Sequence, residues 1–169
     1  MCEGGSSGTG GYGTLDQRVR QYADIVVYGR EGQPQVLVEA KTRKGTSKQW
    51  VAKLRRNMYA HGNLVAAPYF LLALPDRFYL WRNIPNPAST MPPDFTIDAL
   101  PVLEPFFERA GISIDDASEH SLELALSSWL ETLTKAPADN QQEKSSEWLA
   151  ESGLAQAILG GRVEVQALV

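Results

Sequence analysis

The sequence of 169 residues contains a single cysteine, Cys2, and only two histidines, His61 and His120. One cysteine excludes a disulfide framework and a cysteine-based metal site, and two histidines exclude a histidine-rich zinc centre. No apolar run approaches the roughly 18 residues that a membrane span requires, and no secretory signal pattern is present. We therefore expect a cytoplasmic globular protein that has no membrane partner.

The charges are distributed unevenly along the chain. Residues 1–91 contain 12 Lys and Arg against 6 Asp and Glu, whereas residues 92–169 contain 4 against 14. Residues 41–56 contain no acid and seven basic residues, namely Lys41, Arg43, Lys44, Lys48, Lys53, Arg55 and Arg56. Such a run is typical of a phosphate-binding surface, although it also occurs on ordinary solvated helix faces.

Two segments rich in apolar and β-branched residues, 23–28 and 35–41, flank the turn sequence GREGQP and predict a β-hairpin. A symmetric loop pairs Tyr28 with Gln35 and Val26 with Leu37, and it places Asp24 directly opposite Glu39. Opposed side chains have Cβ atoms roughly 4.5–5.5 Å apart, so two carboxylates repel unless one is protonated or both share a cation. Lys41 follows Glu39 by two residues and therefore points to the same face of the sheet.

This arrangement resembles the catalytic core of the PD-(D/E)XK nuclease superfamily, which has the restriction-endonuclease-like fold. The resemblance covers roughly residues 18–82. It implies that Asp24, Glu39 and the carbonyl of Ala40 bind Mg²⁺, with Mn²⁺ as a substitute. It also implies that Lys41 orients or activates the attacking water.

Two departures from the family pattern concern residues at or before the first strand. Ala23 stands before Asp24, where the name-giving pattern has proline. Many members also carry a further acid on a helix that precedes the first strand. The acids upstream of Asp24 are Glu3 and Asp16, neither in a predicted helix, so this ligand position stays unassigned.

The segment 48–60 has helical spacing of its apolar residues, and Thr46 or Ser47 is the expected N-cap. In several branches of the family the helix after the acid–x–Lys strand donates a glutamine to the active site, and Gln49 occupies that position. An exposed polar helix face is the alternative interpretation. The residues expected to hold flanking phosphates are Arg43, Lys44, Lys53 and Arg56.

The remaining elements complete a mixed α/β sheet with a helical C-terminal extension. Strands are predicted at 69–74 and 77–82, so the core order is strand–strand–helix–strand–strand. Helices are predicted at 97–110, 118–133 and 148–159, followed by a strand at 163–168.

The predicted domain organisation has four parts. Residues 1–13 form a flexible arm or tag, 14–82 the nuclease-like core and 83–97 a proline-rich loop. Residues 98–169 form the acidic helical extension, packed on the core as one domain.

We expect Mg²⁺-dependent phosphodiester hydrolysis, with DNA as the nucleic-acid partner. Two alternatives stay open. The chain is a nuclease-like interaction module without turnover, or it binds nucleic acid without catalysis. The acidic half is also expected to cover the sheet, form a homodimer or bind a protein partner.

Overall fold

The computed structural model describes residues 23–61, 64–83, 89–136 and 146–166. The arm predicted at residues 1–13 lies outside the described residues. The elements are β1 (Ile25–Tyr28), β2 (Pro34–Ala40), α2 (Lys48–His61), β3 (Tyr69–Ala73), β4 (Arg77–Arg82), β5 (Phe95–Asp98), α3 (Leu100–Ala110), the 3₁₀ turn η1 (Ile114–Asp116), α4 (Glu119–Lys135), α5 (Glu147–Ser152), α6 (Leu154–Ile158) and β6 (Arg162–Val165).

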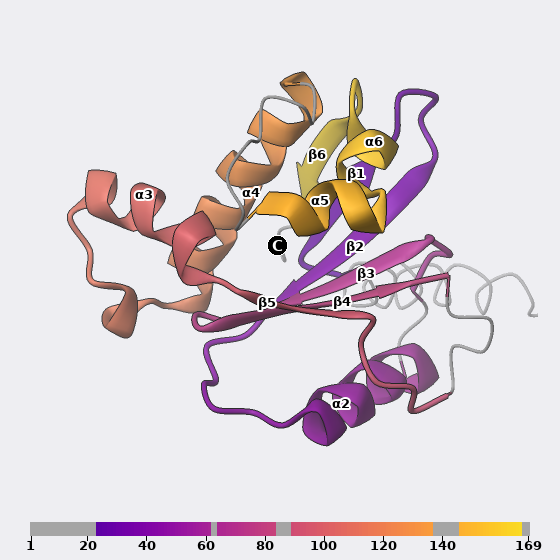
Figure 1. The fold of residues 1–169 in the computed structure, drawn as a ribbon, viewed down its shortest axis with the longest axis horizontal. Helices are drawn as coiled ribbons and strands as arrows, with labels where there is room; N and C mark the ends of the chain where they lie inside the picture. Colours follow the sequence, from indigo (N-terminus) through magenta and orange to yellow (C-terminus); the bar gives the residue numbers. More distant parts are fainter. Residues whose placement is uncertain (1–22, 62–63, 84–88, 137–145, 167–169) are drawn as a thin grey trace, which may run out of the picture.

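One mixed sheet of six strands runs through the structure in the order β5-β4-β3-β2-β1-β6 (Figure 1). Neighbouring strands are antiparallel except β2 and β3, which are parallel and joined by the crossover helix α2. The predicted mixed α/β sheet is therefore confirmed. The two segments that form its edges, β5 and β6, come from the second half of the chain.

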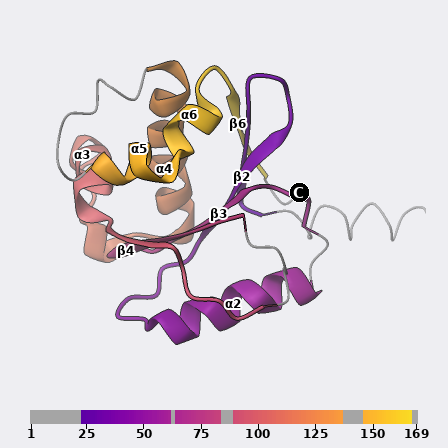
Figure 2. The same cartoon turned by 45° about the vertical axis from the view of Figure 1, so that its right-hand side comes forward.

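Helices cover both faces of the sheet, with α2 on one face and α3, α4, α5 and α6 on the other (Figures 1 and 2). Side chains on successive strand residues alternate between the two faces. In β2, Val36 and Val38 accordingly belong to the cluster under α3 to α6, whereas Leu37 packs in the cluster with Val51 of α2. The burial of both faces explains why β3 is apolar at every position.

Helix α2 confirms the helix that was predicted at residues 48–60. Ser47 is its N-cap: its hydroxyl oxygen accepts a hydrogen bond from the Trp50 N–H at 3.1 Å. Val51 is fully buried, and Leu54 and Met58 pack against the same apolar cluster. This spacing places one stripe of the helix on the sheet and leaves Lys53 and Arg56 exposed.

The predicted hairpin is present, but its register changes close to the turn. Val26 pairs with Leu37, as expected, and Ile25 pairs with Val38. A bulge then shifts the register, so that Tyr28 lies opposite Pro34 and the predicted pairing with Gln35 is wrong. The bulge lies between the turn and the register that leads to Glu39, so the site end keeps the predicted alignment.

The second half of the chain differs from the prediction at three points. Strand β5 begins at Phe95, within the stretch predicted as a loop, and α3 begins only at Leu100. The helix predicted at 148–159 is two short helices, because Gly153 between them has φ +81°. The strand predicted at 163–168 begins at Arg162 as β6 and pairs along β1.

We expect Gly161→Ala to destabilise the protein strongly, because a Cβ atom there would overlap the carbonyl oxygen of Tyr28 and displace β6 from β1. The expected loss in the free energy of unfolding is about 3 kcal/mol, at the upper end for overpacking. The measurement is urea unfolding followed by circular dichroism. The control is Gly111→Ala, which has φ +70° but open space around its Cβ. It should cost only about 1 kcal/mol, and equal losses would contradict the steric argument.

Candidate active site

Asp24 is fixed at the point where β1 begins and β2 ends. Its Oδ2 accepts a hydrogen bond from the Ala40 N–H at 2.9 Å. Its carbonyl oxygen accepts a second hydrogen bond, from the Gln166 N–H at 2.8 Å. The side chain is thus held by β2, while the main chain is held by the segment that follows β6. This carboxylate has a defined position without any bound ligand.

Glu39 is buried beside Lys41, with only 8% of its surface exposed. The Lys41 Nζ lies 3.2 Å from the Glu39 Oε2. This contact follows from the strand geometry, since residues two apart share a face. Glu39 belongs to the face covered by α2, as does its neighbour Leu37. The pair therefore differs from an ordinary surface ion pair, in which both groups are fully hydrated.

The pKa of Glu39 is raised to about 7. The largest cause is burial, which disfavours the carboxylate, and the second is the negative charge of Asp24. The charge and hydrogen bond of Lys41 act in the opposite direction without cancelling this effect. The predicted repulsion between the two acids is therefore a property of the folded protein.

The pKa of Lys41 is raised as well. Burial alone would lower it, but the charge and hydrogen bond of Glu39 outweigh burial, and Glu119 and Asp24 add to them. Lys41 is thus held as a cation between carboxylates. A cation in this position can attract a phosphate or stabilise negative charge that develops on one.

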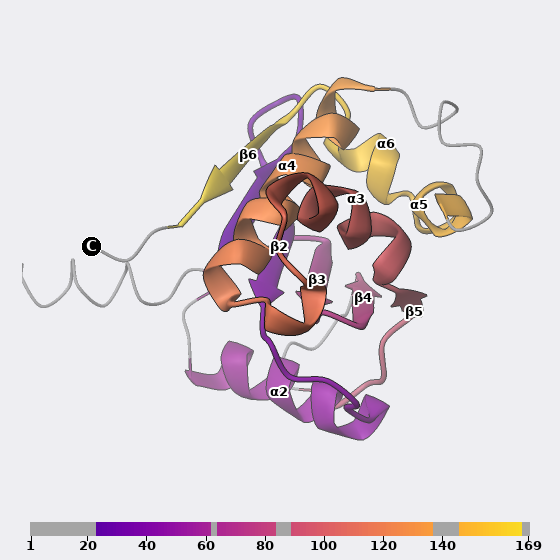
Figure 3. The same ribbon diagram turned by 90° about the vertical axis from the view of Figure 1, so that its left-hand side faces the viewer.

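Helix α4 brings two further acids, Glu119 and Glu123, to this end of the sheet. They are four residues apart and so lie on one side of the helix. Helix α4 itself packs against β1 and β2 (Figure 3). Burial raises the pKa of Glu123, and the negative charges of Asp24 and Glu119 raise it further, against His120 and Lys41. These two acids are the main residues that the sequence reasoning missed.

The start of α4 is fixed by a capping box, in which the Ser118 hydroxyl accepts from the Ser121 N–H at 3.1 Å and the Ser121 hydroxyl accepts from the Ser118 N–H at 2.9 Å. The cap was predictable from the sequence. The proximity of Glu123 to Asp24 and of Glu119 to Lys41 was not, since many tens of residues separate the members of each pair in the sequence. The only signal in the sequence was the i, i+4 spacing of two acids after a cap.

The capacity of the site for a metal rests on two carboxylates and a carbonyl. In the described part of the chain, no three His, Cys, Asp or Glu side chains are grouped closely enough to hold an ion. Mg²⁺, however, is usually bound through one or two carboxylates and keeps several waters. The N–H and C=O of one strand residue point to the same side, so the Ala40 carbonyl also faces the side of Asp24. Asp24, Glu39 and this carbonyl suit a hydrated Mg²⁺.

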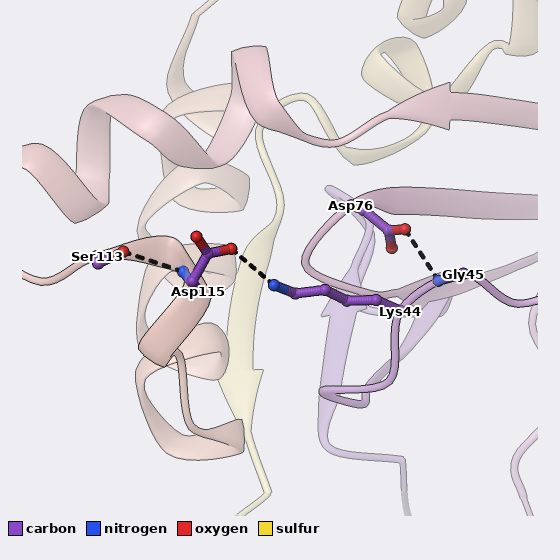
Figure 4. Close-up of polar contacts among 5 residues, drawn as sticks. All are labelled: Lys44, Gly45, Asp76, Ser113 and Asp115. Atoms are coloured by element: carbon purple, nitrogen blue, oxygen red, sulfur yellow. Dashed lines mark hydrogen bonds and ion pairs between the residues drawn. The ribbon is translucent and has the colours of Figure 1, made fainter.

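The predicted phosphate-binding residues Arg43 and Lys44 make different contacts in the structure. Arg43 stacks on Trp50, with its guanidinium carbon 5.0 Å from the ring centroid. The Lys44 Nζ pairs with Asp115 Oδ1 at 2.7 Å, and the Gly45 N–H donates to Asp76 Oδ2 at 3.1 Å (Figure 4). These two contacts tie the loop after β2 to the C-terminal half and to the β3–β4 turn.

The polar residues of α2 lie on its outer surface. Gln49, Lys53 and Arg56 are exposed, as expected for groups that meet solvent or a ligand. No hydrogen bond among the described residues joins Gln49 to Glu39 or Lys41. Its role at the site therefore stays a prediction that follows from the family resemblance.

Comparison with protein-family models, with curated proteins and with solved structures finds no match to this chain. Within the described residues, none of the helices is both long and apolar enough to cross a membrane. The function must therefore be argued from the fold and the site: an α/β protein in which two acids and a lysine meet at the end of a buried hairpin.

We expect the stability of the metal-free protein to fall as the pH rises from about 4.5 to about 7. The folded state keeps a proton on Glu39 up to about pH 7, whereas the unfolded chain loses it near the ordinary pKa of 4.5. The folded state thus binds more protons in this interval, and the free energy of unfolding decreases with pH by on the order of 2 kcal/mol.

Urea unfolding across this pH range in EDTA measures the effect. Glu39→Gln should remove this component of the slope and be the more stable protein at pH 8. Glu104→Gln, an exposed position on α3, is the matched control and should keep the wild-type slope. A slope that is the same in Glu39→Gln and wild type would contradict the assignment.

Proposed function

We propose that this protein is a Mg²⁺-dependent nuclease of the PD-(D/E)XK type that hydrolyses phosphodiester bonds in DNA. The observation that carries the proposal is the contact of the buried Glu39 with the partly exposed Lys41 at 3.2 Å, beside an Asp24 carboxylate held by the Ala40 N–H. Burial of the Glu39 carboxyl beside the partly buried Asp24 and Lys41 costs stability. Such a cost is typical of functional sites.

The order of elements around the site supports the proposal. A hairpin carries the acids, and the strand with Glu39 and Lys41 is followed by α2 and by the parallel strand β3. This matches the strand–strand–helix–strand order of the restriction-endonuclease-like core. We assign Glu123 to the role of the helix acid that many members carry upstream. In this chain the helix comes from the C-terminal half, and β6 lies beside β1.

Asp24, Glu39 and the Ala40 carbonyl would hold the metal, with Glu123 as an outer acid. When bound, Mg²⁺ lowers the pKa of a bound water and neutralises charge on the phosphate. Glu39, whose pKa is about 7 in the free protein, would act as a ligand in its deprotonated form. The fixed position of Asp24 means that little reorganisation is needed.

Lys41 supplies a positive charge on the face where the phosphate would lie. It orients the attacking water and stabilises the additional negative charge on the phosphate oxygens as the new bond forms. No covalent intermediate with the protein is needed. Arg43, Lys44, Lys53 and Arg56 hold flanking phosphates, and Lys44 does so by exchanging its exposed pairing with Asp115 for a phosphate. These contacts give affinity and salt dependence rather than sequence preference.

We expect Lys41→Ala to lower the rate of DNA cleavage at least about 100-fold, the usual effect of removing one group that stabilises the transition state. The measurement is cleavage of supercoiled plasmid and of single-stranded DNA with Mg²⁺, with Mn²⁺ and with EDTA. Lys135→Ala, at the far end of α4 and exposed, is the control and should cleave as wild type does.

If neither wild type nor Lys41→Ala cleaves DNA, the catalytic proposal is overturned and the two non-catalytic alternatives are left. DNA binding that is unaffected by EDTA would then favour a nucleic-acid-binding protein.

We expect Glu123→Gln to weaken metal binding by about tenfold or more, the usual effect of losing an outer group of a metal site. Mn²⁺ binding followed by electron paramagnetic resonance measures this directly and does not depend on activity. Glu131→Gln, an exposed position on the same helix, should leave Mn²⁺ affinity unchanged. If both variants bind Mn²⁺ like wild type, Glu123 is not part of the site.

A further inference from the structure

A hollow of about 250 Å³ lies directly beside Lys41. Three elements that are distant in sequence form it: the loop after β2, the first two turns of α2 and the first turn of α4. The residues that line it are Lys41, Thr42, Arg43, Trp50, Leu54 and Glu119. It is continuous with the candidate active site through Lys41.

The wall of this hollow on the α2 side is apolar and aromatic. Trp50 and Leu54 are only partly buried, and they pack against the apolar cluster between α2 and the sheet. The three other tryptophans of the chain, Trp81, Trp129 and Trp148, are at most 7% exposed and serve as core packing. Trp50 is therefore the tryptophan that a ligand can reach.

The Trp50 ring is already used as a stacking surface. The guanidinium of Arg43 lies 5.0 Å from its centroid, in a cation–π contact. Flat guanidinium groups and nucleobases stack on the same kind of aromatic surface. Because Arg43 is exposed, a base can take its place on the ring while the guanidinium moves to a phosphate.

The charges around the hollow favour an uncharged occupant with charged neighbours. Glu119 repels a phosphate that would enter the hollow, whereas Lys41 and Arg43, which also line it, attract phosphates to its surroundings. A nucleotide satisfies both conditions, since its base is neutral and planar and the phosphates on either side are anionic. A base inside a duplex is stacked and paired, so it cannot enter such a hollow without leaving the helix.

We propose that this hollow binds one unstacked nucleobase next to the phosphate at Lys41, and that the substrate is single-stranded or locally unpaired DNA. The inference rests on the proposed nuclease function for the position of that phosphate. The stacking of the base on Trp50 does not itself require metal or catalysis. It can therefore be tested separately.

The test is binding of a short fluorescein-labelled oligothymidine, and of its duplex with oligoadenine, to the 169-residue chain in EDTA, followed by fluorescence anisotropy. Trp50→Leu keeps an apolar side chain but loses the aromatic face, and it should bind the single strand about tenfold more weakly. Binding of the duplex should change little. Trp50→Phe keeps a stacking surface and should retain most of the single-strand affinity, and it also controls for a general effect on folding.

Two comparisons make the outcome specific. Lys53→Ala removes an exposed cation on the same helix. It should weaken the binding of the single strand and of the duplex by the same factor. The second comparison uses a series of oligothymidines, each with a single abasic site at a different position. One of them should bind the wild-type protein more weakly than the others. All members of the series should bind Trp50→Leu with equal affinity. If Trp50→Leu binds single strand and duplex as wild type does, or weakens both equally, base binding in the hollow is overturned.

The two proposals fail in different ways. Trp50-dependent binding of single strands without metal-dependent cleavage would support the base site and overturn the nuclease. Cleavage that requires Lys41 but proceeds on single strands equally well in Trp50→Leu would support the nuclease and overturn the base site.

Discussion

The antiparallel pairing of β1 with β2 is the constraint on which the site depends. It brings the carboxylates of Asp24 and Glu39 to the same end of the sheet, although like charges repel there and burial raises the pKa of Glu39 to about 7. The pairing persists because the residues next to the acids, from Ile25 to Val27 and from Val36 to Val38, are buried on both faces. Hydrophobic packing along the hairpin thus offsets the electrostatic cost at its end.

The layers of the fold meet at this end of the sheet. Helix α2 lies on one face of the sheet and α4 on the other (Figures 1 and 3). Helix α2 contributes Trp50, and α4 contributes Glu119 and Glu123. The loop between β2 and α2 joins them, since Lys44 pairs with Asp115 beside α4 and Gly45 donates to Asp76 in the β3–β4 turn (Figure 4). The acidic half of the chain is therefore part of the site's construction and not an appendage to a finished core. Its strands β5 and β6 also form both edges of the sheet.

Local patterns predicted the parts of the site that are close in sequence. A symmetric loop between the two predicted strands was sufficient to align Val26 with Leu37, and strand geometry alone put Lys41 on the face of Glu39. The apolar stripe of α2 followed from spacing in the same way, whereas the choice of Ser47 over Thr46 as N-cap came from the structure. Two of the errors occurred where the backbone changes locally: the bulge that sets Tyr28 opposite Pro34, and Gly153, whose positive φ divides one predicted helix into α5 and α6. A third was β5, which pairs with β4 although its stretch was predicted as a loop.

The sequence by itself determined the mixed α/β character, the hairpin with its two acids and lysine, and the helix that follows, because each of these depends on contacts within a few tens of residues. Only the tertiary structure decided that Glu119 and Glu123 join Asp24 and Lys41, that β6 covers the edge of β1, and that Trp50 lines a hollow beside Lys41. Those contacts arise because α4 and β6 dock onto the sheet. This docking is driven by the burial of apolar surface, and the hydrophobic effect has no preferred direction. The spacing of Glu119 and Glu123 shows that they share one face of a helix. Which part of the protein that face meets depends on how the helix packs.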